Sequence, residues 1–184
     1  MKKIYIISSS IRAGRKSQRV TKYFENYIRE NNLGTTEILD LEGYNFPLFH
    51  ERFKNLPEPG ENLVAFREKL LSADGILIVT PEYNGGYPAS LKNIIDVFYD
   101  EWYHKPVAIT TVSNGAFGGS QVITSLQFVL WKMKAFIAPA MFPVPNIDTA
   151  IDDEGVPADK AGFDKRAAGF LKELSWAMDA VQPR

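Results

Sequence analysis

The segment from Asp74 to Trp102 constrains the fold of this chain more than any other part. It begins in ADGILIVT, an apolar stretch rich in β-branched residues, which is typical of a strand buried on both faces. A loop with two glycines and two prolines follows. The next apolar residues are spaced by three and four, as on one helix face: Leu91, Ile94, Ile95, Phe98 and Trp102. A loop between a buried strand and a helix is where open α/β sheets bind ligands, although an ordinary turn would give the same local pattern.

Similar strand and helix patterns alternate along the whole chain. We expect strands at Lys3–Ser8, Thr36–Leu41, Asp74–Thr80, Pro106–Ser113 and within Ala135–Ile147. Between and after them we expect helices from Ser17 to near residue 33 and at Glu61–Ala73, Leu91–Tyr103, Gln121–Lys134 and Asp159–Val181. This alternation predicts a three-layer α/β fold, with a five-stranded parallel sheet and helices on both faces.

Composition limits the classes of function. The chain has 184 residues, of which 45% are hydrophobic, so we expect a single domain spanning 1–184. Its net charge of −1 gives no reason to expect a nucleic acid or an acidic membrane surface as partner. No apolar run approaches the roughly 20 residues of a membrane span, and Ile4–Ile7 is too short for a signal peptide. The absence of cysteine fits a reducing cytoplasm.

The loop after the first strand is basic. Between Lys2 and Phe24 there is no acid, but there are seven basic residues: Lys2, Lys3, Arg12, Arg15, Lys16, Arg19 and Lys22. Ser17 is the expected N-cap of the following helix, whose first amides, with nearby hydroxyls and an arginine, would form a site for a phosphate. A solvated basic loop with a serine cap is the alternative. The loop matches neither G-x-G-x-x-G nor the Walker pattern.

A third flexible loop, Asn114–Gly119, follows the fourth strand. If the strand order is 2-1-3-4-5, the loops after strands one, three and four meet around the switch point between strands one and three. One of these loops is suited to a phosphate, and the other two expose backbone amides beside few charges. Together they suit a flat ring with polar edges that carries a phosphate, which predicts flavin mononucleotide (FMN) as the ligand.

Three other features are ambiguous. The segment 42–59 is long, aromatic and aperiodic, so it either covers a pocket or neighbouring subunit or packs locally. His50, within it, has no partner motif and is interpreted as structural or exposed. The acidic run Asp152–Glu154 is interpreted as a solvated loop, because consecutive carboxylates point in different directions. We therefore predict no metal site.

Two helices are apolar around most of their circumference. The stretch at 121–134 carries Ile123, Phe128 and Trp131 beside its main apolar face, and the stretch at 90–103 has a similar excess. Such helices must bury more than one side, so we expect a homodimer or homotetramer formed through this pair. Deep burial within one subunit is the alternative.

The chain resembles the NAD(P)H-dependent FMN reductase family, flavodoxin-like enzymes that include quinone, azo and chromate reductases. The resemblance covers most of the chain and rests first on PEYNGGYPASLKNIID at 81–96, which is similar to the family's P-E-Y-N-x-S-x-P-G-x-L-K-N-A-I-D. It differs at Gly86 and Ala89. The second motif is SSIR at 9–12 with the later Ser17, similar to the family's G-S-x-R phosphate loop, with Ser9 in place of the glycine. Residues 113–119 resemble the third loop.

The resemblance implies a role for each loop. The phosphate of FMN would be held by Arg12, by the hydroxyls of Ser10 and Ser17, and by the amides of Ser17 and Gln18. The ring would lie along the backbone of Pro81, Glu82, Tyr83 and Asn84, with Ser113 and Gly115 on its pyrimidine side. Hydride would pass from NADPH or NADH to a small acceptor in a ping-pong cycle, with no catalytic acid or base from the protein.

Two other functions stay open at this stage. A flavodoxin-type electron carrier would bind FMN without nicotinamide turnover, but the chain lacks the T-x-T-G-x-T phosphate loop of flavodoxins. A phosphate- or nucleotide-binding regulator would bind no flavin. The sequence names neither the acceptor nor the preferred nicotinamide.

Overall fold

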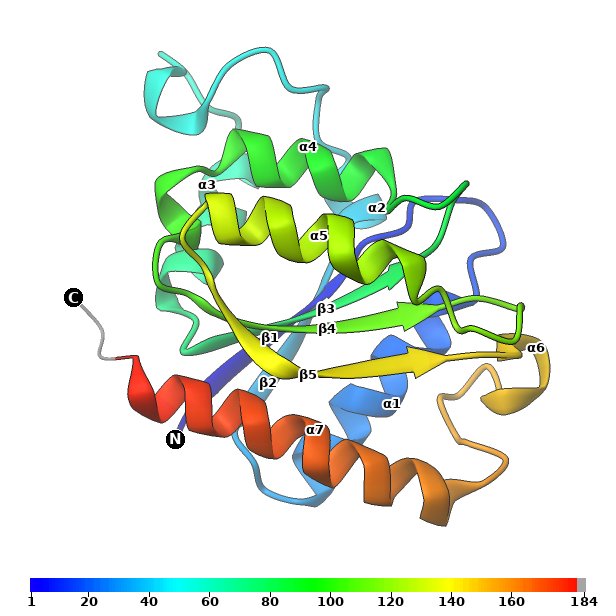
Figure 1. Ribbon diagram of the computed structural model, residues 1–184. Helices are drawn as coiled ribbons and strands as arrows, with labels where there is room; N and C mark the ends of the chain where they lie inside the picture. The colour runs from blue at the N-terminus through cyan, green and yellow to red at the C-terminus, as the bar shows by residue number, and fades with distance from the viewer. Residues whose placement is uncertain (182–184) are drawn as a thin grey trace.

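The computed structural model describes residues 1–181, which contain a five-stranded parallel sheet (Figure 1). The strands, in chain order, are β1 (Lys3–Ser8), β2 (Thr35–Asp40), β3 (Gly75–Pro81), β4 (Pro106–Val112) and β5 (Phe136–Val144). In space their order is β2-β1-β3-β4-β5, and every neighbouring pair is parallel. The predicted fold class and strand order are confirmed.

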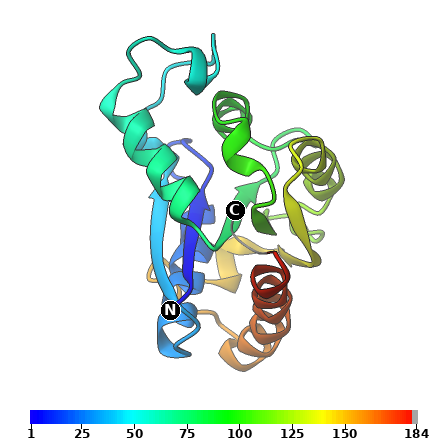
Figure 2. The same ribbon diagram turned by 90° about the vertical axis from the view of Figure 1, so that its left-hand side faces the viewer.

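Helices cover both faces of the sheet, which Figure 2 shows nearly end-on. On one face lie α1 (Ser17–Glu30) and α7 (Lys160–Ala180). On the other lie α3 (Glu61–Ser72), α4 (Ala89–Val97) and α5 (Gln121–Lys132). Shorter elements lie between these: α2 (Leu41–Tyr44), α6 (Ile147–Ala150) and the 3-10 turns η1 (Phe53–Asn55) and η2 (Asp100–Trp102).

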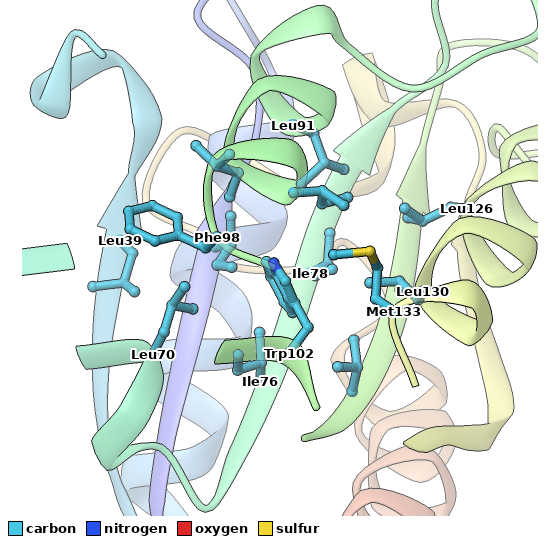
Figure 3. Close-up of a cluster of buried hydrophobic side chains, with 14 of the residues drawn as sticks. Leu39, Leu70, Ile76, Ile78, Leu91, Phe98, Trp102, Leu126, Leu130 and Met133 are labelled. Carbon is cyan, nitrogen blue, oxygen red and sulfur yellow. The ribbon is translucent and has the colours of Figure 1, made fainter. Parts of the chain in front are cut away.

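The two helical layers enclose separate cores because successive side chains of a strand point to opposite faces. On β3, Leu77 and Val79 pack beneath α1 and α7, whereas Ile76 and Ile78 pack beneath α3, α4 and α5. Figure 3 shows the second core, with Trp102 lying over the sheet. The central strands β3 and β4 are buried along almost their full length, which explains why their sequences are largely apolar.

The end of α1 differs from its prediction. The helix ends at Glu30, and the turn is made by Asn31 and by Asn32, which has φ +54°. Asparagine tolerates this left-handed conformation, so Gly34 is not needed to stop the helix. Gly34 serves close packing instead, because a Cβ there would lie 2.5 Å from the carbonyl oxygen of Lys2.

The helix expected at 91–103 is interrupted. α4 ends at Val97, Phe98 is extended (φ −102°, ψ 98°), and η2 follows. The break turns Phe98 and Trp102 into the core, where both side chains are fully buried. The large apolar residues of α4, with Phe98 and Trp102, are therefore buried within one chain.

On α5, by contrast, two aromatic side chains stay on the surface. Phe128 is 61% and Trp131 63% exposed, and their ring centroids lie 5.9 Å apart. Across residues 1–181, no helix combines the length and the apolar character required to cross a membrane.

The segment 45–60 extends away from the sheet as an arm (Figure 1). Asn93 fastens its base, since its Nδ2 donates to the Pro47 carbonyl (2.9 Å) and its Oδ1 accepts from the Phe49 amide (2.6 Å). Phe53 packs on Phe98, with ring centroids 5.7 Å apart. The arm is therefore largely held by local packing, although Phe49 and the neighbouring His50 are exposed.

Candidate functional site

A cleft of about 460 Å³ lies at the carboxyl ends of β1, β3 and β4. It is lined by Arg12, Ala13, Gly14, Arg15, Lys16, Ser17, Pro81, Glu82, Tyr83, Val112, Ser113, Asn114, Ile147 and Asp148. Most of these residues belong to the ends of β1, β3 and β4 and to the loops that follow them. These three loops were expected to meet at the switch point, and their convergence confirms that part of the prediction. The last two residues belong to α6.

One end of the cleft offers groups that suit an anion. The Arg12 side chain is exposed, and within residues 1–181 its guanidinium makes no hydrogen bond or ion pair. Ser17 is only 3% exposed, yet its Oγ has no hydrogen-bond partner among the described residues. Ser17 and Gln18 are also the first residues of α1, where amides have no acceptor within the helix. These donors define an anion-binding corner.

The prediction that Ser17 caps α1 is wrong. Lys16 is the N-cap residue, and Ser17 is the first residue of the helix itself. The Ser17 Oγ makes no capping hydrogen bond, since it has no hydrogen-bond partner among the described residues. The hydroxyl is consequently left for a ligand.

The other arginine of this loop is not available to an anion. The Arg15 side chain is only 9% exposed, and its Nη2 lies 2.5 Å from Asp40 Oδ2 and 3.1 Å from Glu42 Oε2. The Gln18 amide group also donates to Asp40 (3.2 Å), so that side chain turns away from the cleft. Only the backbone of Gln18 remains a candidate ligand.

A partly buried hydrogen bond joins the loops after β1 and β3. The Ser10 Oγ and the Tyr83 hydroxyl lie 2.6 Å apart, and the Ser10 Oγ also accepts from the Arg12 amide (3.3 Å). Ser10 is fully buried and does not line the cleft. Its hydroxyl therefore fixes the position of one loop relative to the other.

The loop after β3 is a tight hairpin turn. Tyr83 and Gly86 exchange both backbone hydrogen bonds, at 2.8 and 3.0 Å, and Asn84 and Gly85 have φ +54° and +79°. Two consecutive positive φ values are typical of a type I′ turn, for which Asn-Gly is a preferred pair. Asn84 lies at the tip and does not line the cleft, whereas Pro81, Glu82 and Tyr83 do. The turn fixes the backbone of these three residues.

The loop after β4 is packed against the end of β5. A Cβ on Gly118 would lie 2.8 Å from the Val144 amide nitrogen, so only glycine allows this approach. The Ser113 Oγ donates to the Gly115 carbonyl (3.3 Å). Ser113 lines the cleft and Gly115 lies just outside its lining.

The lining residues that were missed as candidates from the sequence include Lys16, Asn114, Ile147 and Asp148. The Asp148 carboxylate forms an ion pair with Lys16 and accepts a hydrogen bond from Asn114 Nδ2 (3.0 Å). The rule that found the other loops also applies to Ile147 and Asp148, because these two residues follow β5 at the same edge of the sheet. The prolines within and after this strand obscured its end in the sequence.

A cleft at the switch point of a doubly wound parallel sheet, with an anion-binding corner, defines a flavodoxin-like α/β protein. The sequence model of the family described as NADPH-dependent FMN reductase matches residues 2–149. The chain therefore belongs to the NADPH-dependent FMN reductase family.

Named relatives agree with this assignment. The chain is 35% identical over 184 residues to an NAD(P)H-dependent FMN reductase of Schizosaccharomyces pombe, an alignment that covers 94% of this chain and 90% of the yeast protein. It is 26% identical to an FMN-dependent NADPH-azoreductase of Staphylococcus haemolyticus, over 92% and 91% of the two chains. Among solved structures, the flavoenzyme FerB of Paracoccus denitrificans shares the fold, with TM-score 0.78, 20% identity and coverage of 97% and 98%.

Proposed function

We propose that the cleft binds FMN and that the protein is an NAD(P)H-dependent oxidoreductase acting on a small electrophilic acceptor. The observation that carries this proposal is the anion-binding corner. Among the described residues, the buried Ser17 hydroxyl has no hydrogen-bond partner and the Arg12 guanidinium is unpaired, beside the first amides of α1. A buried hydroxyl that lacks a hydrogen bond is costly, and a phosphate oxygen would satisfy it.

In this proposal the chain holds FMN mainly by its backbone. Arg12, the Ser17 hydroxyl and the amides of Ser17 and Gln18 bind the phosphate. The backbone of Pro81, Glu82 and Tyr83, continued by Asn84 at the tip of the turn, would run along the ring, and the Ser113–Gly115 segment would reach its pyrimidine side. Ser10 acts indirectly, through its bond to Tyr83.

When bound, FMN supplies the hydride chemistry by which NAD(P)H reduces the acceptor in a ping-pong cycle. The protein contributes position and backbone dipoles, and no side chain is needed as an acid or base. Quinones, flavins and azo compounds are acceptors of suitable chemistry. The names of the relatives, which include an azoreductase and a quinone reductase of Pseudomonas putida, support this range.

We also propose that the 184 residues form one FMN-binding domain and that it works in the cytoplasm as a homodimer or homotetramer. The near-neutral net charge and the absence of cysteine suit that compartment and a small-molecule partner. The exposed aromatic pair on α5 is the feature that supports association, since Phe128 and Trp131 are more than half exposed. α4 contributes less than its sequence suggests, because its apolar residues are buried in the chain itself.

An anaerobic titration tests the proposed activity. Purified protein reconstituted with FMN should show flavin absorbance that bleaches promptly on addition of NADPH or NADH and returns with a quinone. A flavodoxin-type electron carrier, which has no nicotinamide turnover, would keep its flavin absorbance for minutes after the nicotinamide is added. Failure to take up FMN at all would refute the proposal.

A further inference from the structure

Asp148 places a carboxylate in the cleft that contains the anion-binding corner. Its Oδ1 pairs with Lys16 Nζ, and its Oδ2 accepts a hydrogen bond from Asn114 Nδ2 (3.0 Å). The Asp148 amide donates in return to Asn114 Oδ1 (3.3 Å). All three residues line the same cleft as Arg12 and Ser17. We call this arrangement the Lys16–Asp148–Asn114 clasp.

The backbone that carries Asp148 is fixed by Arg19. The Arg19 Nη1 donates to the carbonyls of Ile147 (3.3 Å) and Ile151 (3.1 Å), and its Nη2 pairs with Asp153 at 2.7 Å. The Arg19 side chain is 16% exposed, so these contacts are partly shielded from water. The backbone of Asp148 therefore cannot move away from the cleft without breaking these contacts.

The ion pair within the clasp is exposed and exchangeable. The side chains of Lys16 and Asp148 are 44% and 42% exposed, and ion pairs at such positions are weak. Lys16 can therefore exchange its carboxylate partner for a phosphate in the same cleft. Arg15 has no such freedom, because it is almost buried against Asp40 and Glu42.

We propose that Asp148 sets how strongly the cleft prefers FMN over riboflavin, its dephosphorylated form, by competing with the phosphate for Lys16 and by repelling its negative charge. This inference rests on the proposed FMN site and deepens it. A cleft with Arg12 and Lys16 alone would hold a phosphate more tightly than one that also contains a carboxylate. Because Asp148 offers Lys16 a second partner, the phosphate is held less tightly, and the bound cofactor can exchange.

The variant Asp148→Asn tests the proposal, because it removes the charge while its amide oxygen can still accept from Asn114. Dissociation constants for FMN and riboflavin are measured by quenching of flavin fluorescence, at low and at high salt. The Kd for FMN should fall about 5- to 30-fold, the effect of one unit charge a few ångströms away in a partly aqueous site. The Kd for riboflavin should change less than about twofold, and the gain for FMN should shrink at high salt.

Two further variants separate charge from structure. Lys16→Met should weaken FMN and leave riboflavin unchanged, and the gain from Asp148→Asn should be smaller in that background. Glu154→Gln is the matched control, since Glu154 is exposed on the same segment and does not line the cleft. It should leave both constants unchanged. If Asp148→Asn fails to fold, Asp148→Ser replaces it.

An unchanged or lower preference for FMN in Asp148→Asn overturns the inference, and Asp148 is then only a tether for the Asn114 loop. In that case the wild type still binds FMN, so the proposed function stands. Wild-type protein that binds neither flavin overturns both.

Discussion

Arg12 and Arg15 lie three residues apart in one basic loop, yet only one of these guanidinium groups is free for a ligand. Asp40 and Glu42 neutralise Arg15, whereas Arg12 is exposed and unpaired among the described residues. A count of basic residues cannot distinguish the two, because the acids that pair with Arg15 come from the next strand and turn. At this scale the partners of a charge, not its presence, decide its function.

Replacement of Arg12 by alanine should weaken FMN binding by about 1–3 kcal/mol, the cost of losing a hydrogen bond to a charged group. Riboflavin should bind as before, because it lacks the phosphate. Fluorescence titration of both flavins measures the effect. Arg29→Ala is a suitable control, since Arg29 is exposed on α1 outside the cleft and its guanidinium pairs with Glu25. Equal FMN affinity in the wild type and in Arg12→Ala would remove Arg12 from the proposed site.

Among the elements, α1 and α7 are linked by a buried tyrosine. The Tyr23 side chain is 3% exposed, and its hydroxyl donates to Asp164 Oδ1 on α7 (3.0 Å). Burial raises the pKa of Tyr23, and the hydrogen bond and charge of Asp164 raise it further. Below about pH 10, the ordinary tyrosine pKa, the hydroxyl is protonated in both the folded and the unfolded chain. Above that pH the unfolded chain loses the proton first, so the free energy of unfolding falls as the pH rises.

Tyr23→Phe should therefore flatten the alkaline part of the stability profile. The wild type should lose up to about 1.4 kcal/mol more per pH unit above pH 10 than the variant, the effect of one proton. At pH 7 the variant should be less stable by about 1 kcal/mol because it lacks the bond to Asp164. Urea unfolding at pH 7, 9 and 11 measures both quantities. Parallel profiles for the two proteins would exclude Tyr23 as the titrating group.

The sequence predicts which helices and strands form better than it predicts the residues at which they end. The strand–helix alternation determines the sheet and its layers, because burial on both faces leaves long apolar runs such as Ile76–Val79. The interruption after Val97 could not be predicted, since Phe98 and Trp102 continue the helical spacing and only tertiary packing turns them inward. In the site, the ends of the predicted strands identified Arg12 and Pro81 as site residues, but they did not identify Asp148.

At the scale of the whole molecule, the helical layer that contains α4 and α5 combines a fully buried inner side with exposed aromatic side chains on its outer side. The Leu91, Phe98 and Trp102 side chains are fully buried between the sheet and its helices (Figure 3). On α5, next to this core, Phe128 and Trp131 are exposed. Both residues lie on one helix, and their rings are neighbours, so they form a small apolar surface rather than scattered residues. A second copy of the chain is the partner that we propose for it.

Trp131→Glu should convert the wild-type oligomer into a smaller species, because the substitution places a charge in the proposed interface and removes a large apolar side chain. Light scattering coupled to gel filtration at micromolar concentration measures the mass. Trp176→Glu is the matched control: Trp176 is 57% exposed on α7, away from α5, and packs near Phe136. The Trp176→Glu variant should have the same mass as the wild type, because it leaves the interface formed by α5 unchanged. A wild-type protein that is monomeric at this concentration would contradict the proposed assembly, and a Trp131→Glu variant of unchanged mass would place the interface elsewhere.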